Sequence, residues 1–246
     1  YTYVSGHIKG AVCWNWHIDF QDPIRRDIPG PQAFEQLLGR SGIDNETTVI
    51  LYGDKNNWFA AYAFWLLKYY GHKDVRLMNG GRKKWIAEGR PLTTESVQPE
   101  PAVYRVQTTN PAVRATRHQI FQGLDQPDTV FIDTRAPKEF SGEMVAPDDL
   151  PQEGAMRGGH LPGALNITWG QAVFEDGTFK PARDLRQIYT AHNVTPDKNV
   201  IVYCRIGERS SHSWFVLHYL LGYPQVSNYD GSWAEWGNLI DAPIER

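Results

Sequence analysis

Two stretches of the sequence read almost alike, and together they decide the fold. Residues 200–210 read VIVYCRIGERS and residues 49–58 read VILYGDKNNW, at an offset of 151 positions. At the same offset, six further aromatic, aliphatic or glycine positions match without a gap: Phe64 with Phe215, Leu66 with Leu217, Gly71 with Gly222, Val75 with Val226, Gly80 with Gly231 and Trp85 with Trp236. The motif GHIKGAV at 6–12 returns as GHLPGAL at 159–165. This self-similarity predicts two copies of one domain.

Each copy carries the signatures of a strand, a helix and a second strand, in that order. A four-residue apolar run, typical of a short buried strand, is followed by helical spacing that ends at a glycine and then by another strand-like run. These segments are 49–52, 58–70 and 75–78 in the first copy, and 200–203, 211–221 and 226–229 in the second. We therefore predict an α/β fold with two tandem domains, each a parallel sheet flanked by helices.

The composition between the copies predicts the domain boundaries. Residues 93–111 are rich in proline and lack helical periodicity, as expected of a linker. We expect the first domain over 1–92 and the second over 112–246. A helix-like segment (117–123) and a strand (129–133) precede the Gly-His motif of the second copy, whereas only residues 1–5 precede it in the first. The first copy is therefore expected to lack its opening strand.

Composition limits the kind of protein this is. The 246 residues are 41 % apolar, and 25 Lys and Arg stand against 28 Asp and Glu. This balance argues against nucleic-acid binding. The two cysteines cannot form a four-thiolate metal site or a disulfide scaffold, so we expect a reducing, cytoplasmic compartment. No apolar run approaches the roughly 20 residues that span a bilayer, so no membrane segment is expected.

Function is expected where the two copies differ. Gly53 follows the first strand of the first copy, whereas Cys204 stands at the equivalent place in the second. The carboxyl end of a parallel strand, just before a helix, is where ligands bind in open α/β sheets. Loop N–H groups can bind an anion there. The helix N-terminus, Arg205 and Arg209 are expected to lower the pKa of the Cys204 thiol and make it a nucleophile.

Three other reactive side chains are expected to be structural. His7 and His160 occupy the same motif in both copies, so we expect each of them to set a turn or a hydrogen bond. Cys13, in the run AVCW at 11–14, is expected to be inert packing in a strand or the core.

The segment CRIGERS with the following SHSWFVL resembles the active-site loop of the tandem-domain rhodaneses, which are thiosulfate sulfurtransferases. The resemblance covers nearly the whole chain, through GHIKGA, LYGDKNNWFAAYAFW, NGGRKKW, FIDTRAPKEFSGE, GHLPGALN, EDGTF and NYDGSW. The first copy of that family is catalytically silent, which agrees with Gly53. The resemblance implies sulfur transfer through a Cys204 persulfide, from thiosulfate to cyanide, without a metal or organic cofactor. Dithiols are chemically equivalent candidates for the acceptor, and a sulfur-accepting protein is a further candidate partner.

The length of the loop separates this chemistry from others. Rhodanese-like phosphatases place an arginine six positions after the cysteine, where this chain has Ser210. The 3-mercaptopyruvate sulfurtransferases typically read CGSGVT, and two arginines instead favour a doubly charged inorganic donor. Two alternatives stay open: a 3-mercaptopyruvate sulfurtransferase, and a sulfur-carrier protein that a partner enzyme loads.

The candidate substrate-binding residues surround Cys204. Arg205 and Arg209 are expected to bind the donor. The N–H groups of the loop, which includes Ile206 and Gly207, are expected to stabilise the persulfide. Glu208 either orients one of these arginines or is a solvated charge. Ser210 is expected to cap the helix and to bond the persulfide.

Three further candidates lie outside the loop. Asp133 and Arg135 end a strand expected to lie beside it, with a structural role as open as a substrate role. The family often has a substrate arginine soon after that strand, where this chain has Lys138-Glu139-Phe140, and Arg157 is a candidate to replace it. Trp233 and Trp236 are expected in the core.

Overall fold

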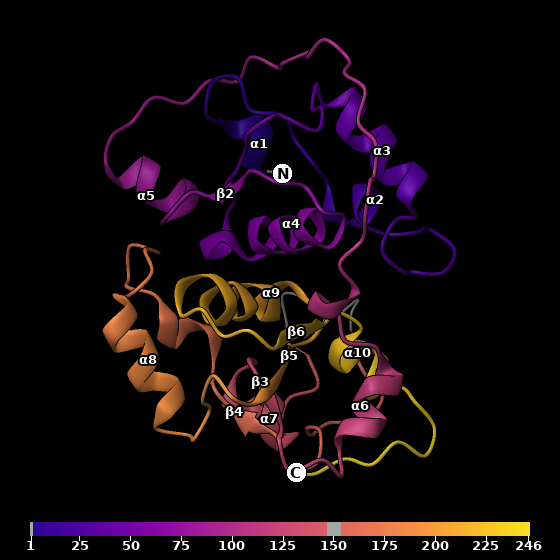
Figure 1. The fold of residues 1–246 in the computed structure, drawn as a ribbon. Coiled ribbons are helices and arrows are strands. Elements are labelled where there is room, and N and C mark those ends of the chain that lie inside the picture. The colour runs from indigo at the N-terminus through magenta and orange to yellow at the C-terminus, as the bar shows by residue number, and fades with distance from the viewer. Residues whose placement is uncertain (1, 147–153) are drawn as a thin grey trace. The chain divides into compact units, whose positions relative to one another are not determined.

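The structure, a computed structural model, describes residues 2–146 and 154–246. It divides into two compact units, one containing the residues up to Asn110 with Asp176–Thr178, the other Pro111–Glu175 with Phe179–Arg246. In each unit helices pack around parallel strands (Figure 1). The predicted α/β class with two domains of the same kind is confirmed.

The first unit is built around a pair of parallel strands. In chain order its elements are α1 (Thr2–Ser5), α2 (Trp16–Asp19), α3 (Pro31–Arg40), β1 (Val49–Leu51), η1 (Lys55–Asn57), α4 (Trp58–Tyr69), β2 (Val75–Leu77) and α5 (Gly81–Ala87). Every residue of helix α4 from Ala60 to Leu67 is buried. A helix that is buried on nearly every side is expected to be apolar on nearly every side, as this one is.

One edge of β1 carries no strand among the described residues. β1 pairs with β2, with Val49 opposite Val75. A cavity of about 660 Å³, lined by Val49–Leu51 and by aromatic side chains such as Trp14 and Phe59, adjoins the strand. In the second unit, the corresponding strand is paired on both edges. Among the described residues, the first unit therefore has no counterpart of β3, which pairs with β5 in the second unit.

The second unit holds a four-stranded parallel sheet in the order β4-β3-β5-β6. Its elements are η2 (Pro111–Val113), α6 (Arg117–Gly123), β3 (Thr129–Asp133), α7 (Pro137–Ser141), β4 (Leu165–Asn166), η4 (Trp169–Ala172), α8 (Ala182–Thr190), β5 (Asn199–Tyr203), α9 (Glu208–Phe215), the π-helical η5 (Val216–Leu220), β6 (Val226–Tyr229) and α10 (Ser232–Trp236). Asp133 pairs with Tyr203, and Tyr203 with Tyr229, so three strands end at one edge of the sheet.

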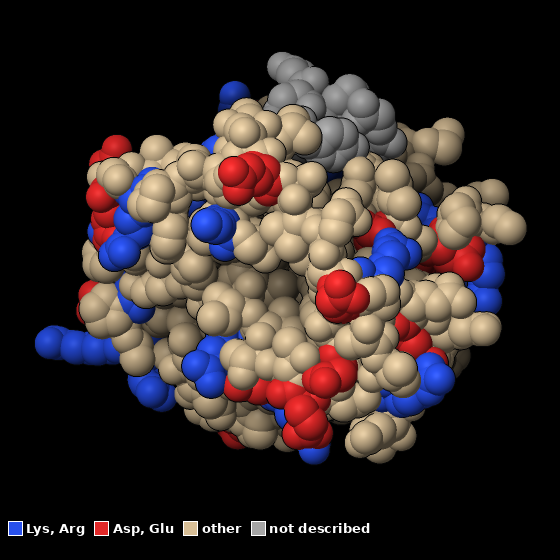
Figure 2. Space-filling model, turned by 90° about the horizontal axis from the view of Figure 1, so that it is seen from above, with Lys and Arg blue, Asp and Glu red and all other residues tan. Residues whose placement is uncertain are grey.

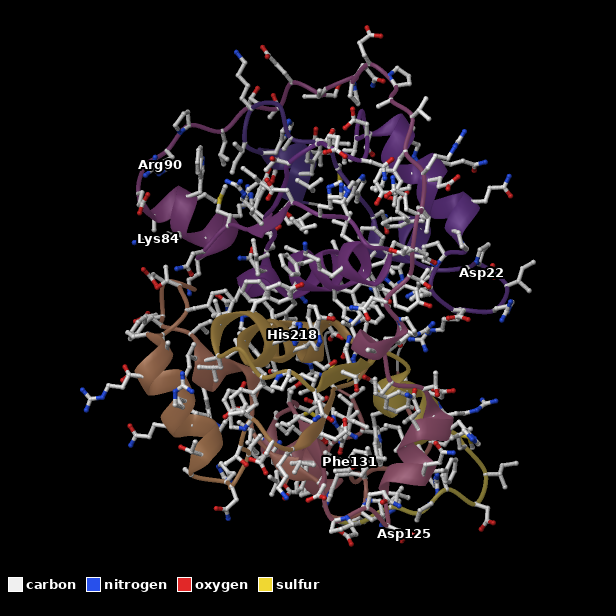
Figure 3. The ribbon with its side chains drawn as sticks, in the orientation of Figure 1. Asp22, Lys84, Arg90, Asp125, Phe131 and His218 are labelled. Atoms are coloured by element: carbon white, nitrogen blue, oxygen red, sulfur yellow. The ribbon has the colours of Figure 1, made fainter. Side chains whose placement is uncertain are left out.

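Alternation along β5 explains how both faces of this sheet are covered. Ile201 and Tyr203 point into a core with Phe131, Trp233 and Trp236, and Phe131 lies within it in Figure 3. Val200 and Val202, which are also buried, point to the opposite face. Strand β5 is therefore apolar at nearly every position, as expected of a central parallel strand.

Two local predictions are wrong. Helix α9 begins at Glu208 and not at residue 211. Its first turn consists of polar residues that are nevertheless buried, so the apolar spacing used to predict the helix did not include them. Cys13 is exposed and lies in irregular chain, not in a strand or in the core. The apolar run 11–14 was too short to distinguish a strand from an apolar loop.

The predicted linker runs as extended chain and is bonded to the first unit. Ala102 N donates to Gly39 O, and Asn110 N donates to Tyr69 O. These bonds explain why the residues up to Asn110 group with the first unit.

No helix within residues 2–146 and 154–246 is long and apolar enough to cross a membrane. On the face drawn in Figure 2, basic and acidic side chains are interspersed and neither sign forms a continuous field. The chain as a whole carries a formal net charge of −3.

Replacing a core isoleucine of β5 should destabilise the protein strongly. Ile201, 3 % exposed, packs in the core, so Ile201→Ala is expected to lower the free energy of unfolding by about 2–5 kcal/mol. The matched control is Ile240→Ala at a side chain that is 98 % exposed, with an expected change within about 0.5 kcal/mol. Urea unfolding followed by circular dichroism measures both, and equal midpoints would contradict this description of the core.

Candidate active site

Cys204 follows the last residue of β5 and is held by its own backbone. Its N–H donates to Ser232 Oγ at 3.0 Å, and its carbonyl accepts from Trp233 N at 3.1 Å. Both partners belong to α10, which follows the neighbouring strand β6. The Cys204 side chain is fully buried in this structure. The neighbouring strand ends therefore fix the sulfur at the carboxyl edge of the sheet, as the sequence predicts.

A glycine turn brings the chain from Cys204 into α9. Gly207 has φ +99°, and a Cβ built there would lie 3.0 Å from Asp230 Cα, so any other residue would be strained. The turn directs the Gly207 N–H to Cys204 Sγ at 3.2 Å. Ser210 Oγ lies 3.6 Å from Sγ and 3.1 Å from Gly207 O. Two donors therefore face the sulfur.

Ser210 does not cap the helix as predicted. Gly207 occupies the N-cap position of α9 and Ser210 lies inside the first turn. Its hydroxyl returns to Gly207 O or points at the sulfur, and a single O–H donates to one of them at a time. The prediction that Ser210 bonds the persulfide stays a prediction.

Glu208, the first residue of α9, presents an acceptor to the sulfur. Its Oε2 lies 3.2 Å from Cys204 Sγ, so the thiol donates to the carboxylate. Its Oε1 lies 3.4 Å from Arg209 Nε. The side chain is 1 % exposed and is therefore not the solvated charge that was one of its two interpretations.

The pKa of the Cys204 thiol is raised, contrary to the prediction. Burial is the largest cause, and the charge of Glu208 adds to it. The charge of Arg209 and hydrogen bonds from Ser210 lower the pKa, but by less. The prediction considered the helix N-terminus and the two arginines, but it could not include the removal of the sulfur from water or the nearby carboxylate.

Arg209 is held by two carboxylates. Its Nη1 and Nη2 bond Glu139 Oε2 and Oε1 at 2.7 and 3.0 Å, and its Nε faces Glu208. This bidentate pair joins α9 to α7, and both partners are buried. The guanidinium charge is therefore already balanced inside the protein.

Sequence reasoning missed Glu139. It is the third residue of α7, and its Oε2 also accepts from Ala136 N at 3.1 Å. Burial acts to raise its pKa, but hydrogen bonds and charge from Arg209, with the charge of Arg135, outweigh burial, so the pKa of Glu139 is lowered. An acidic residue at a helix start, soon after the strand that pairs with β5, is the signal that could have found it.

The other candidates of the loop are buried as well. Arg205 is 2 % exposed, and its carbonyl accepts from Ala234 N at 2.9 Å. Ile206 is also buried, between the sulfur and the glycine turn in the sequence. The structure thus brings the whole predicted loop together around Cys204.

Asp133 and Arg135 lie at the adjoining strand end and satisfy each other. Arg135 Nε lies 2.9 and 3.0 Å from the two Asp133 carboxylate oxygens, and its Nη2 donates to Gly159 O at 2.7 Å. The guanidinium also lies over the Trp233 ring, 4.7 Å from its centre. These contacts give the pair a structural role, and a role toward substrate stays a prediction.

Arg157 is engaged elsewhere in the second unit. Its guanidinium donates to backbone carbonyls near the end of the chain: Trp236, Gly237, Leu239 and Ala242. These bonds join the segment after residue 153 to the C-terminal segment. The geometry therefore does not place Arg157 with the loop, although the sequence made it a candidate for donor binding.

The two motif histidines bond backbone carbonyls. His160 Nδ1 contacts Phe140 O at 2.8 Å and its ring stacks on Phe140. His7 contacts Tyr3 O and Glu95 O, each at 3.0 Å. These bonds are the structural role expected of a motif that both copies share.

The buried charges around Cys204 balance. Three arginines are matched by three carboxylates, all buried: Arg135, Arg205 and Arg209 with Asp133, Glu139 and Glu208. Among the described residues, no cluster of three or more His, Cys, Asp or Glu side chains could hold a metal ion. The chemistry that this arrangement itself supports is that of a nucleophilic sulfur with one acceptor and two donors beside it.

Comparisons with known proteins point to one family. The model of the rhodanese-like domain matches residues 1–88 and again 116–239. The chain is 55 % identical to the sulfur carrier protein TtuD of Thermus thermophilus, over 99 % of this chain and 87 % of that protein. It is 51 % identical, over the same shares, to a Mycolicibacterium smegmatis protein named "Putative thiosulfate sulfurtransferase".

Solved structures of EanB share the fold. One of them, in a tetrahedral intermediate state with ergothioneine, contains a cysteine persulfide and superposes with a TM-score of 0.86 at 26 % identity. The match covers 99 % of this chain but only 61 % of EanB.

Replacing Glu139 should destabilise the protein in a pH-dependent way. Glu139→Gln leaves a buried guanidinium without its bidentate partner, so a loss of about 3–5 kcal/mol in the free energy of unfolding is expected at pH 7. Because the folded-state pKa of Glu139 is lowered, its stabilisation is present above its unfolded-state pKa and is lost as the pH falls through the folded-state value.

The difference between wild type and Glu139→Gln should therefore shrink as the pH is lowered from 7 towards 3. Urea unfolding at several pH values measures it. A difference that stays constant with pH would show that the ionised carboxylate is not what stabilises α7 against α9.

Proposed function

The chain belongs to the rhodanese-like family, and on that premise we propose that this sulfurtransferase takes its sulfur from thiosulfate and carries it as a persulfide on Cys204. The observation that carries the proposal is the Cys204 loop itself. The loop follows a central parallel strand and places Gly207 N and Ser210 Oγ beside the sulfur. The first copy has Gly53 where the second has Cys204.

The first half-reaction forms the persulfide. The Cys204 thiolate attacks the outer sulfur of thiosulfate, a new S–S bond forms, and sulfite leaves with the electron pair of the bond that breaks. The product is an anionic persulfide, whose charge equals that of the thiolate that was consumed. Gly207 N–H, 3.2 Å from Sγ, and the Ser210 hydroxyl are the donors that stabilise it.

The second half-reaction regenerates the cysteine. A thiophilic acceptor such as cyanide or a dithiol attacks the outer sulfur and leaves with it, and Cys204 returns as thiolate. Each half-reaction is complete without the other substrate, as in a ping-pong mechanism. A cysteine persulfide is recorded in EanB, a more distant structural relative.

The balanced charges around Cys204 affect how a sulfur donor is bound. Arg209 is already paired with two carboxylates, so the loop carries less net positive charge than two arginines alone suggest. Arg205 and Arg209 stay the arginines that we propose for donor binding, and a dianion must enter beside Glu208. The relatives named for thiosulfate support this donor.

A second function has its own support. The chain is 55 % identical to a protein named as a sulfur carrier, and a site with balanced charges suits a persulfide delivered by another protein as well as a free dianion. The Cys204 chemistry is the same in both cases, and only the donor differs.

Two free cysteines agree with a reducing compartment, and we propose the cytoplasm.

Incubation with thiosulfate should add one sulfur to Cys204. Mass spectrometry of the intact protein and of its peptides is expected to show a gain of about 32 Da on the peptide with Cys204, and cyanide should remove it with release of thiocyanate. Cys204→Ser should neither gain the sulfur nor turn over. The matched control, Cys13→Ser, changes the exposed cysteine of the silent first copy and should load and turn over as wild type does.

The donor panel decides between the two functions. No sulfur gained from thiosulfate, together with loading by a persulfidated protein, would establish the carrier and reject the thiosulfate enzyme. Loading by 3-mercaptopyruvate alone would reject both. A Cys204→Ser variant that still turns over would show that the nucleophile is wrongly assigned.

A further inference from the structure

We propose that Glu208 is the base that takes the thiol proton of Cys204 before the sulfur attacks its donor. The contacts of Cys204 Sγ include a carboxylate oxygen of Glu208 at 3.2 Å and hydrogen-bond donors of Gly207 and Ser210. A backbone amide and a neutral hydroxyl are much weaker bases than a carboxylate. The carboxylate is therefore the group placed to receive it. This step adds a detail to the proposed function, and the identity of its sulfur donor rests on that function.

The surroundings of the sulfur make a base necessary. Cys204 is fully buried and Glu208 is 1 % exposed, so the thiol has no direct contact with bulk water in this structure. A proton lost to solvent would also leave a thiolate and a carboxylate side by side, and like charges at this distance strongly disfavour that state. Transfer to Glu208 leaves one negative charge in place of two.

The two carboxylate oxygens of Glu208 face different groups. Its Oε1 lies 3.4 Å from Arg209 Nε, and Arg209 is fixed in turn by the bidentate bonds to Glu139. The other oxygen, Oε2, is thereby left facing the sulfur. The start of α9 after the Gly207 turn sets the position of the Glu208 backbone.

The other charged groups around this pair are accounted for. Glu139 of α7 is bonded to Arg209, and Asp133 and Arg135 after β3 are bonded to each other. Asp230 after β6 is bonded to Arg114. Arg205, next to Cys204 in the loop, is buried as well. Glu208 is the carboxylate in direct contact with the thiol of Cys204.

The step balances without an oxidant. The S–H bond of Cys204 breaks and an O–H bond forms on Glu208, while the sulfur keeps the electron pair and attacks the outer sulfur of thiosulfate. Sulfite leaves with the electrons of the S–S bond that breaks. The protonated Glu208 then donates to the persulfide, and its proton returns to Cys204 once the acceptor has removed the outer sulfur.

The pH profile distinguishes this role from a structural one. In wild type, transfer of the proton to Glu208 within the site should make the rates of persulfide formation from thiosulfate and of alkylation by iodoacetamide nearly independent of pH, a plateau, around neutral pH. In Glu208→Gln the plateau should vanish, because the thiol must then ionise to solvent. The rate constant should rise about tenfold per pH unit and lie about 10²-fold below wild type near pH 7.

Two matched variants control for loss of structure. Glu46→Gln removes a carboxylate of the first unit that is 80 % exposed, so it should keep both the plateau and the wild-type rate. Glu208→Asp keeps a carboxylate one methylene further from the sulfur and should keep a plateau at a reduced rate. Single-turnover mass spectrometry and alkylation rates between pH 5 and about 10 give the profiles, with circular dichroism as the check on folding.

The results separate this role from the proposed donor. A Glu208→Gln protein with the wild-type profile and rate would overturn the base. Faster alkylation than wild type at neutral pH would also overturn it, because Glu208 would then act only by holding the proton on the thiol. If Glu208→Gln does not fold, an unchanged rate for Glu208→Asp at every pH overturns it. A wild-type protein that shows the alkylation plateau but gains no sulfur from thiosulfate rejects the donor and keeps the base.

Discussion

The bidentate ion pair between Arg209 and Glu139 is the interaction on which the rest of the site depends. It joins the first turn of α9 to α7 and is buried on both sides. A buried guanidinium needs a partner of opposite charge, and this one orients Arg209 so that its remaining nitrogen, Nε, faces Glu208. Glu208 in turn reaches Cys204. One contact between two helices thus determines how the sulfur meets its acceptor.

Burial and charge act in opposite directions at Cys204, and burial is the stronger. The helix start and Arg209 favour a thiolate, but the loss of water and the nearby carboxylate raise the pKa of the thiol. A site of this kind keeps its sulfur protonated at rest and needs a base when a donor arrives. The same two donors that face the thiol remain in place for the anionic persulfide.

Particular elements show how far the sequence reaches. The apolar runs 49–52 and 200–203 predict β1 and β5, because a buried parallel strand requires apolar residues at nearly every position. The apolar pattern does not predict the start of α9, since Glu208, Arg209 and Ser210 are polar yet buried. Cys13 escapes it because a short apolar run has the same composition in a core and in an exposed loop.

The sequence by itself determined that the protein is two copies of one α/β domain and that Cys204 is where they differ, because both facts are patterns along the chain. The tertiary structure alone decided which charges meet at the sulfur. Glu139 and Arg209 are 70 positions apart, and their pairing follows from the parallel register of β3 and β5, which no local pattern encodes. Tertiary packing also places the Arg157 guanidinium against carbonyls of the C-terminal segment, 85 positions away in the case of Ala242.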